Sequence, residues 1–243
     1  MEWFKQWFNS EEYLNVYQHR DKKDAKELLQ LVLGHIDSAK VKTVFDMATG
    51  NGRHAILLAS KGYEVTAVDL SEMLLDIAKK NAAKENLDIE FVHSDLRKYN
   101  PDKKFDLIIN LFTSIGYFEK DEENFHLLNN AYDLLEDEGY FVLDYMNKNF
   151  VQNTLVPVSV DITDNSTITQ NRFIKNERVI KEIIIEKEKS TEKYYESVRM
   201  FSYEEIKSTM EKIGFKILNT FGDFLGNPFE LETSPRIIII SRK

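Results

Sequence analysis

The sequence predicts an α/β fold built on a mostly parallel sheet. Between residues 42 and 147, short apolar runs rich in β-branched residues alternate with segments of helical periodicity. This alternation is typical of βαβ units, whose strands lie parallel. The runs contain few polar residues, as expected of strands that helices cover on both faces. The expected strands are 41–47, 63–70, 87–95, 105–112 and 140–146, and the expected helices are 52–62, 71–86 and 121–139.

Capping residues support these helices. Ser71 stands where an N-cap is expected, and Gly62 and Gly139 are expected to end helices. A further helical segment is predicted over residues 10–37, ahead of the first strand. The aromatic residues before it recur at helical spacing and are expected to pack onto the core, with a lid over a ligand as the alternative. These residues are Trp3, Phe4, Trp7 and Phe8.

The end of the chain completes the predicted sheet. An amphipathic helix is expected over 202–215, followed by strands over 216–222 and 234–243. No helix separates these two strands, so the last one can lie antiparallel to its neighbour. The sequence therefore predicts a Rossmann-like sheet of seven strands, mostly parallel, with helices on both faces.

The stretch 148–202 has a different character. It is rich in β-formers and charges, shows no helical period, and has hairpin-like breaks near 175–177 and 190–191. We expect a small antiparallel β insertion in a core formed by 1–147, with its N-terminal helical lid, and 203–243. The insertion leaves the core after the fifth strand and is expected to roof an acceptor pocket, or to form a dimer interface. Its expected apolar face consists of Phe173, Ile183, Ile185, Tyr195 and Met200.

Composition excludes several classes of function. The chain has 243 residues, no cysteine and a formal net charge of -9. Disulfides, thiolate metal sites and cysteine nucleophiles are therefore excluded, and nucleic acid is not an expected partner of so acidic a chain. The five histidines lack metal-ligand spacing, so no metal is expected. Neither a signal peptide nor a membrane span is predicted, which favours a cytoplasmic protein.

A glycine motif follows the first predicted strand. Gly50-x-Gly52-x-x-Ala55 also fits the dinucleotide fingerprint, in which a pyrophosphate sits at a helix N-terminus. Asp46, at the tip of the strand, would repel a pyrophosphate. A carboxylate there suits a ligand without phosphate and with positive charge, such as S-adenosylmethionine, which carries a sulfonium and an ammonium group.

With this motif the chain resembles the class I S-adenosylmethionine-dependent methyltransferases. Their first motif reads approximately D-x-G-x-G-x-G, and residues 46–52 match it with Ala48 in place of the first glycine. Because alanine disfavours positive φ, an ordinary φ is expected at Ala48. More narrowly, the chain looks like bacterial small-molecule methyltransferases with a β-sheet insertion after the fifth strand, among which amino-sugar N-methyltransferases are the best understood.

The resemblance implies a set of cofactor-binding residues. Asp69 ends the second strand and can accept both ribose hydroxyl hydrogens. Asp95, after the third strand, is expected at the adenine amino group, with the backbone N–H of Leu96 on a ring nitrogen. Arg20 could pair with the cofactor's carboxylate, and Tyr17 could lie near the sulfonium. The full expected set is Tyr17, Arg20, Asp46, Ala48, Thr49, Gly50, Gly52, Asp69, Leu70, Asp95, Leu96, Asn110 and Phe112.

Catalysis of methyl transfer mainly needs alignment and removal of a proton where required. Residues 110–118 are expected to border the sulfonium and the acceptor, with Tyr117 as a hydrogen-bond partner or base and His19 as the favoured histidine base. His54 is expected to pack locally and Arg53 to be a solvated helix residue. Either of two insertion arginines could meet a carboxylate or phosphate of the acceptor. These are Arg172 and Arg199.

Several alternatives stay open. The loop after the fourth strand lacks the Pro-Pro-aromatic motif of adenine-methylating enzymes. Magnesium-dependent relatives need an acid after the fourth strand and an Asp-Asn pair after the fifth. Here Asn110 stands in place of the acid, and Asp144 and Asn147 are not adjacent. A small-molecule N- or O-methyltransferase, monomeric or homodimeric, is therefore predicted. The alternatives are a non-catalytic regulatory module that binds the cofactor, and a nicotinamide-dependent oxidoreductase.

Overall fold

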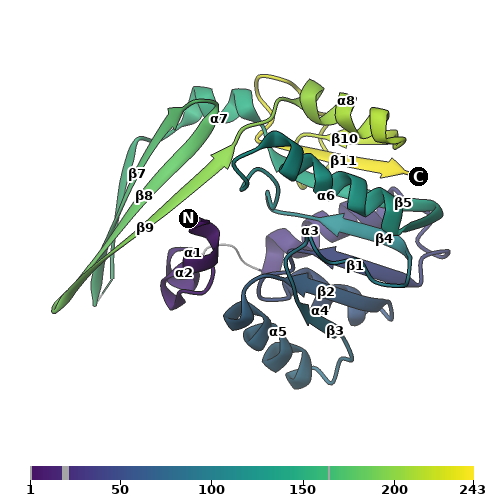
Figure 1. Ribbon diagram of the computed structural model, residues 1–243, viewed down its shortest axis with the longest axis horizontal. Helices are drawn as coiled ribbons and strands as arrows, with labels where there is room; N and C mark the ends of the chain where they lie inside the picture. Colours follow the sequence, from purple (N-terminus) through teal and green to yellow (C-terminus); the bar gives the residue numbers. More distant parts are fainter. Residues whose placement is uncertain (1, 18–21, 164) are drawn as a thin grey trace.

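A computed structural model describes residues 2–17, 22–163 and 165–243 of the chain. Its larger sheet has seven strands in the order β10-β11-β5-β4-β1-β2-β3 (Figure 1). β11 lies antiparallel to both β5 and β10, and the other pairs are parallel. The predicted fold is confirmed. The strands are β1 (Thr43–Met47), β2 (Glu64–Asp69), β3 (Glu90–His93), β4 (Phe105–Asn110), β5 (Leu135–Met146), β10 (Lys216–Phe221) and β11 (Arg236–Arg242).

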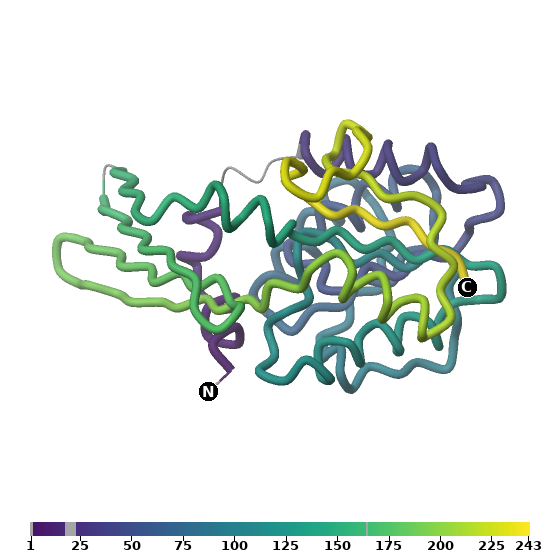
Figure 2. Tube along the Cα trace, turned by 90° about the horizontal axis from the view of Figure 1, so that it is seen from above, coloured from purple at the N-terminus to yellow at the C-terminus, as the bar shows by residue number. Residues whose placement is uncertain are grey.

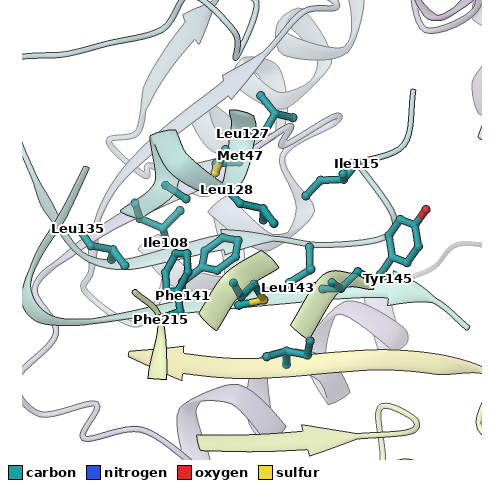
Figure 3. Packing of buried hydrophobic residues seen from close by; sticks show 14 of the residues in the cluster. Met47, Ile108, Ile115, Leu127, Leu128, Leu135, Phe141, Leu143, Tyr145 and Phe215 are labelled. Carbon is teal, nitrogen blue, oxygen red and sulfur yellow. The ribbon is translucent and has the colours of Figure 1, made fainter. Parts of the chain in front are cut away.

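Helices cover both faces of this sheet because its strands bury successive side chains on opposite sides. Phe45 belongs to one buried cluster, together with residues of α6 and α8, whereas its neighbour Val44 belongs to a second cluster with residues of α3 and α4. Figure 3 shows Leu127 and Leu128 of α6 packed over Ile108 in the first cluster. The helices are α3 (Lys22–Gly34), α4 (Arg53–Ala59), α5 (Glu72–Lys84), α6 (Asp121–Leu134) and α8 (Tyr203–Ile213). None in the described part of the chain is long and apolar enough to span a bilayer.

The N-terminal region differs from the single helix expected over 10–37. It forms α1 (Trp3–Trp7) and α2 (Glu11–Val16) ahead of α3, and residues 18–21 lie outside the described part. Ser10 caps α2 by accepting a hydrogen bond from the Glu12 amide at 3.2 Å. Trp7 and Val16 do not join the clusters of the large sheet, but pack with buried residues of the insertion.

The insertion forms a second, antiparallel sheet, in the order β6-β7-β8-β9, that extends away from the large sheet (Figures 1 and 2). β7 and β8 are joined by a tight turn in which both Asn176 and Glu177 have positive φ. The absence of a helix was wrongly predicted, since α7 precedes the sheet, and the second turn lies at residues 188–189. The elements are α7 (Lys148–Thr154), β6 (Val158–Ile162), β7 (Ser166–Lys175), β8 (Arg178–Lys187) and β9 (Ser190–Arg199).

The residues expected to form one apolar face of the insertion lie on both faces of its sheet. Ile183 and Ile185 are buried against the N-terminal helices. Phe173 and Tyr195 are 38% and 42% exposed, because the strand alternation turns them to the other side.

The end of α6 also differs from expectation. β5 begins directly after α6, so Gly139 lies in a strand and does not end a helix.

Candidate functional site

A cavity opens at the carboxyl ends of β1, β2, β3 and β4, where ligands gather in open α/β sheets. The wall comes from the turn after each of these strands and from α1 and α2. Ten of the residues expected at the cofactor or in catalysis line it. They are Tyr17, Ala48, Thr49, Gly50, Asp69, Leu70, Asp95, Leu96, Phe112 and Tyr117.

The turn after β1 brings backbone to the cavity wall through left-handed residues. Ala48, Gly50 and Gly52 have φ of 61°, 59° and 79°. The ordinary φ expected at Ala48 is therefore wrong: the turn imposes a conformation that alanine adopts only at a cost of roughly 1–2 kcal/mol. A Cβ on Gly52 would lie 2.7 Å from the Cβ of Ala78, so the absence of a side chain lets α4 approach α5.

Two buried carboxylates organise this turn. Asp69 accepts hydrogen bonds from the Gly50 amide at 2.7 Å and the Ser71 amide at 2.8 Å. Asp46 accepts one from the Thr49 hydroxyl at 2.6 Å and lies behind the wall, without lining the cavity. Burial raises the pKa of Asp69, and it raises that of Asp46 to about 7. Asp46 is therefore placed to exchange a proton when a cationic group approaches.

The third acid, Asp95, has the opposite electrostatic environment. The Arg97 guanidinium donates to both carboxylate oxygens, at 3.0 and 2.6 Å, and this pairing lowers the pKa of Asp95. Arg97 also binds Glu2 at 2.6 Å and lies over the ring of Phe118, 4.3 Å from its centroid. The adenine end of the expected site thus carries an ionised carboxylate tied to the start of the chain.

Asn110, at the end of β4, is completely buried. Its Nδ2 donates to the carbonyl of Met47 at 3.2 Å, while its Oδ1 has no hydrogen-bond partner in the part of the chain that the structure describes. Neither Asn110 nor Gly52 lines the cavity itself. An unsatisfied buried oxygen costs about 1–3 kcal/mol, so its presence beside a binding cavity suits a donor supplied by a ligand.

Phe112 and Thr113, just after β4, are both left-handed, with φ of 57° and 60°. Asp144 of β5 holds this strained pair, because its carboxylate accepts the Phe112 amide at 2.8 Å and its carbonyl accepts the Thr113 amide at 3.0 Å. Arg236 of β11 completes the arrangement with a 2.7 Å ion pair to the fully buried Asp144. No local sequence pattern predicts this pairing, since 92 positions separate the two residues.

Arg53 and His54, at the start of α4, line the cavity. The Arg53 guanidinium lies 3.9 Å from the centroid of the Phe112 ring, so the expectation of a solvated residue is wrong. His54 packs against the same ring, as expected, at 5.4 Å between centroids. Burial lowers the pKa of His54, which keeps the imidazole neutral. Its Nε2 has no hydrogen-bond partner among the described residues.

The N-terminal helices close the cavity with aromatic rings. Tyr117 lies among three of these rings, with centroid distances of 5.3 Å to Trp3, 6.1 Å to Phe4 and 5.5 Å to Phe8. The hydroxyl of Tyr17 donates to the carboxylate of Glu196 in β9. The two other expected residues of this region, His19 and Arg20, lie outside the described part of the chain.

Comparison with known proteins agrees with this geometry. Residues 44–139 match the family model described as "Methyltransferase domain". Residues 44–139 therefore form a methyltransferase domain, within the seven-stranded sheet described above. A curated protein of Geobacillus sp. (strain WCH70) named as a methyltransferase is 24% identical over 211 residues, which cover 83% of this chain and 85% of that protein.

Solved structures share the fold of this methyltransferase across the insertion as well as the core. An S-adenosylmethionine-dependent methyltransferase from Clostridium acetobutylicum has a TM-score of 0.83 at 18% identity, over 95% of each chain. A sugar N-methyltransferase from Streptoalloteichus sp. has a TM-score of 0.71 at 16% identity, over 95% of this chain and 92% of that one.

A second cavity of the methyltransferase lies between the loop after β4, the N-terminal helices and the insertion. The acceptor pocket expected under the insertion stays a prediction; of the two insertion arginines expected there, Arg172 lines this cavity. Arg199 instead forms ion pairs with Asp121, Glu177 and Glu205, at 3.3, 3.0 and 3.1 Å, and does not line the cavity. The residues that line both cavities are Phe8, Tyr13, Tyr17, Phe112 and Tyr117.

Neither cavity is bordered by a cluster suited to a metal: the described residues contain no group of three His, Asp or Glu side chains that could hold an ion. The carboxylate of Asp144, considered above as a magnesium ligand, is engaged by Arg236 and the Phe112 amide. Asn147 is likewise occupied, because its Nδ2 donates to the carbonyls of Leu231 and Ser234, both at 2.8 Å.

Proposed function

We propose that this chain transfers the methyl group of S-adenosylmethionine to a nitrogen or oxygen atom of a small-molecule acceptor. The observation that carries the proposal is the placement of three acids at the ends of successive strands: Asp69 and Asp95 line one cavity, and Asp46 lies behind its wall. A second cavity lies beside the first. Three acids suit a positively charged cofactor that lacks phosphate, and Arg53 is the one cation among the described residues that line this cavity.

The order of the strands assigns a part of the cofactor to each group of residues. Asp95 and the backbone of Leu96, beyond β3, would hold the adenine, and Asp69, beyond β2, would accept the ribose hydroxyls. The methionine end would then lie toward β4, near Asn110 and His54. The unpartnered Oδ1 of Asn110 can accept from an ammonium group, and the neutral His54 can donate to a carboxylate without adding charge.

The cofactor, when bound, supplies an activated methyl group on a positively charged sulfur. The residues around it have to align the acceptor and exclude water. Tyr117 lines both cavities and lies within the aromatic group formed with α1, so it can orient an acceptor through a hydrogen bond, and its phenolate form could remove a proton from that acceptor. The aromatic faces also favour a cationic centre between the cavities. His19 remains a second proposed base.

The roofed second cavity favours a small molecule over a polymer. Its walls come from four separate parts of the chain and include β7, β8 and β9 of the insertion, which we propose as the acceptor roof. The sugar N-methyltransferase of similar fold supports a nitrogen acceptor, and an oxygen acceptor is the second possibility. A single chain contains both cavities, which is compatible with either a monomer or a homodimer.

Calorimetry with S-adenosylhomocysteine and S-adenosylmethionine tests the cofactor assignment directly. We expect micromolar dissociation constants, on the order of -7 to -8 kcal/mol, and no binding of NAD or NADP under the same conditions. Binding of a nicotinamide nucleotide in place of the methionine derivatives would favour the oxidoreductase alternative. Tight cofactor binding without methyl transfer to any compound of a metabolite extract would favour the regulatory module.

A further inference from the structure

The inner face of the insertion carries a row of charged side chains. The register of the antiparallel sheet pairs Arg172 of β7 with Lys181 of β8, and Lys181 with Glu196 of β9. Directly paired residues project from the same face, and this face also carries Ile183, which is buried against the N-terminal helices. All three charged residues line the second cavity.

Two of the three cations that line this cavity have a carboxylate partner. Lys181 Nζ lies 3.2 Å from Glu196 Oε2, and Arg236 Nε lies 2.7 Å from Asp144 Oδ1. Arg172 differs from both, because within the described part of the chain it forms no ion pair. Asp24 and Glu196 also line the cavity, but neither forms an ion pair with Arg172. A half-buried charge without a paired carboxylate favours an anionic ligand.

The hydrogen bonds of Arg172 fix its guanidinium and still leave donors available. Nη1 donates to the Ser159 hydroxyl at 3.0 Å, and Nη2 donates to Gln170 Oε1 at 2.8 Å. Gln170 is itself buried and donates to Asp161 at 3.2 Å, which orients its oxygen toward Arg172. A guanidinium has five N–H groups, so three remain. That number is sufficient for a two-point contact with a carboxylate or a phosphate.

Another part of the cavity lining, from the N-terminal helices and the loop after β4, is aromatic. Tyr117, Tyr13 and Phe8 line both cavities, so they mark the junction at which the acceptor atom would meet the methyl group. Electron-rich ring faces disfavour an anion and favour a cationic or neutral nucleophile. The second cavity is therefore polarised, with aromatic rings at the junction and Arg172 on the wall formed by the insertion.

We propose that the acceptor is a bifunctional small molecule: one end carries the amine or hydroxyl that is methylated, and the other carries an oxyanion, a carboxylate or a phosphate, that binds Arg172. This inference rests on the proposed methyltransferase function and specifies its acceptor. Arg172 would contribute mainly to acceptor affinity and orientation, since it does not line the cofactor cavity.

The test uses the full chain, cofactor with a deuterated methyl group, and a small-molecule extract of the source organism. The labelled mixture is separated on an anion exchanger at about pH 11, where an amine is largely uncharged and a carboxylate or phosphate stays ionised. We expect the labelled product in the retained fraction. Phosphatase treatment then distinguishes the two sources of charge, because a phosphate ester loses retention and a carboxylate keeps it. A labelled product found only in the unretained fraction would overturn the inference while leaving the methyltransferase function intact. Label on no compound at all would contradict the proposed function itself.

Variants then test Arg172 with the isolated acceptor. Arg172→Gln should raise KM about tenfold or more, from the loss of a charged contact, with kcat within about threefold and unchanged affinity for S-adenosylhomocysteine. Arg172→Lys should recover part of the affinity, since it restores charge without the two-point geometry. Lys193→Gln is the matched control, because Lys193 is exposed on the outer face of the same sheet. Equal KM values in wild type and Arg172→Gln would exclude Arg172 as the anion site.

Discussion

The two cavities of this methyltransferase are adjacent, yet they are built in different ways. The first takes most of its wall from turns that follow β1, β2, β3 and β4, within residues 48–118. The second assembles side chains from the N-terminal helices, the loop after β4, the insertion and the segment before β11. A cofactor site formed by strand ends depends on local chain geometry, whereas the acceptor site depends on how distant segments pack. Substitutions in the two regions should therefore have different effects on stability and on ligand affinity.

The largest expected effect is on the free energy of unfolding, and it concerns Asp144, which supports the loop that borders both cavities. Asp144→Ala would leave the Arg236 guanidinium without its buried partner and the amide of left-handed Phe112 without its acceptor. Breaking one partner of a buried pair costs roughly 3–5 kcal/mol, which urea unfolding can measure. The control is Glu138→Ala, which breaks the more exposed pair with Arg242 and should cost at most about 1 kcal/mol. A similar, small cost for both variants would show that Asp144 does not support the loop.

The next effect separates cofactor binding from acceptor binding. Asp69→Ala removes a carboxylate that organises the Gly50 amide and is proposed to accept the ribose hydroxyls. Affinity for S-adenosylhomocysteine should fall by roughly 2–4 kcal/mol, measured by calorimetry. Arg172→Gln should leave this affinity unchanged. If Asp69→Ala binds as tightly as wild type, the ribose site has been misplaced, and the contrast between the two cavities loses its basis.

Two glycines of the same turn provide an internal comparison of steric demand. Gly52→Ala places a Cβ 2.7 Å from that of Ala78 as well as imposing positive φ, and should destabilise the fold by about 2–4 kcal/mol. Gly50→Ala meets no atom within 4 Å and should cost only the backbone term, about 1–2 kcal/mol. Thermal unfolding of both variants gives the difference. An equal loss would mean that α4 can move away from α5 without cost.

The pH dependence of cofactor affinity tests the electrostatic part of the site. Burial raises the pKa of Asp46 to about 7, so the cofactor-free protein keeps a proton there below this pH. A cationic ligand favours the carboxylate, so affinity for S-adenosylmethionine should rise as pH increases toward 8 and fall by about tenfold between pH 8 and pH 6. Asp46→Asn should lower the affinity and remove this dependence. A wild-type affinity that stays flat over the range would contradict the role of Asp46.

The smallest effect concerns the alanine of the first motif. Ala48 has a φ of 61°, which glycine adopts without the cost of a Cβ. Ala48→Gly should therefore stabilise the protein slightly, by about 0.5–1 kcal/mol after allowance for the greater freedom of glycine in the unfolded chain. Differential scanning calorimetry can measure the change. A loss of stability would indicate that the methyl group packs usefully within the turn.

The contrast between the cavities also explains what the sequence could predict. The acids at strand ends and the cap at Ser71 depend on neighbouring residues, so periodicity and spacing located them. Arg53 was misplaced because its position over Phe112 depends on a loop that begins nearly sixty residues later in the chain. The pairing of Asp144 with Arg236 depends on an antiparallel neighbour reached only after the insertion. Alternation of hydrophobicity predicts that a strand exists, but the strand's neighbour decides which side chains meet.

The ladder between β5 and β11 has a consequence for the order of folding. It pairs Met146 with Arg236, and so closes a loop that contains the whole insertion, α8 and β10. Closure of a long loop carries an entropic cost that grows with its length, and the hairpins of the insertion can form by local pairing beforehand. During synthesis β11 follows these segments. The five parallel strands can therefore associate before Arg236 is available to pair with Asp144. A nascent chain could thus hold the cofactor turn in place before the loop that borders the acceptor has its final support.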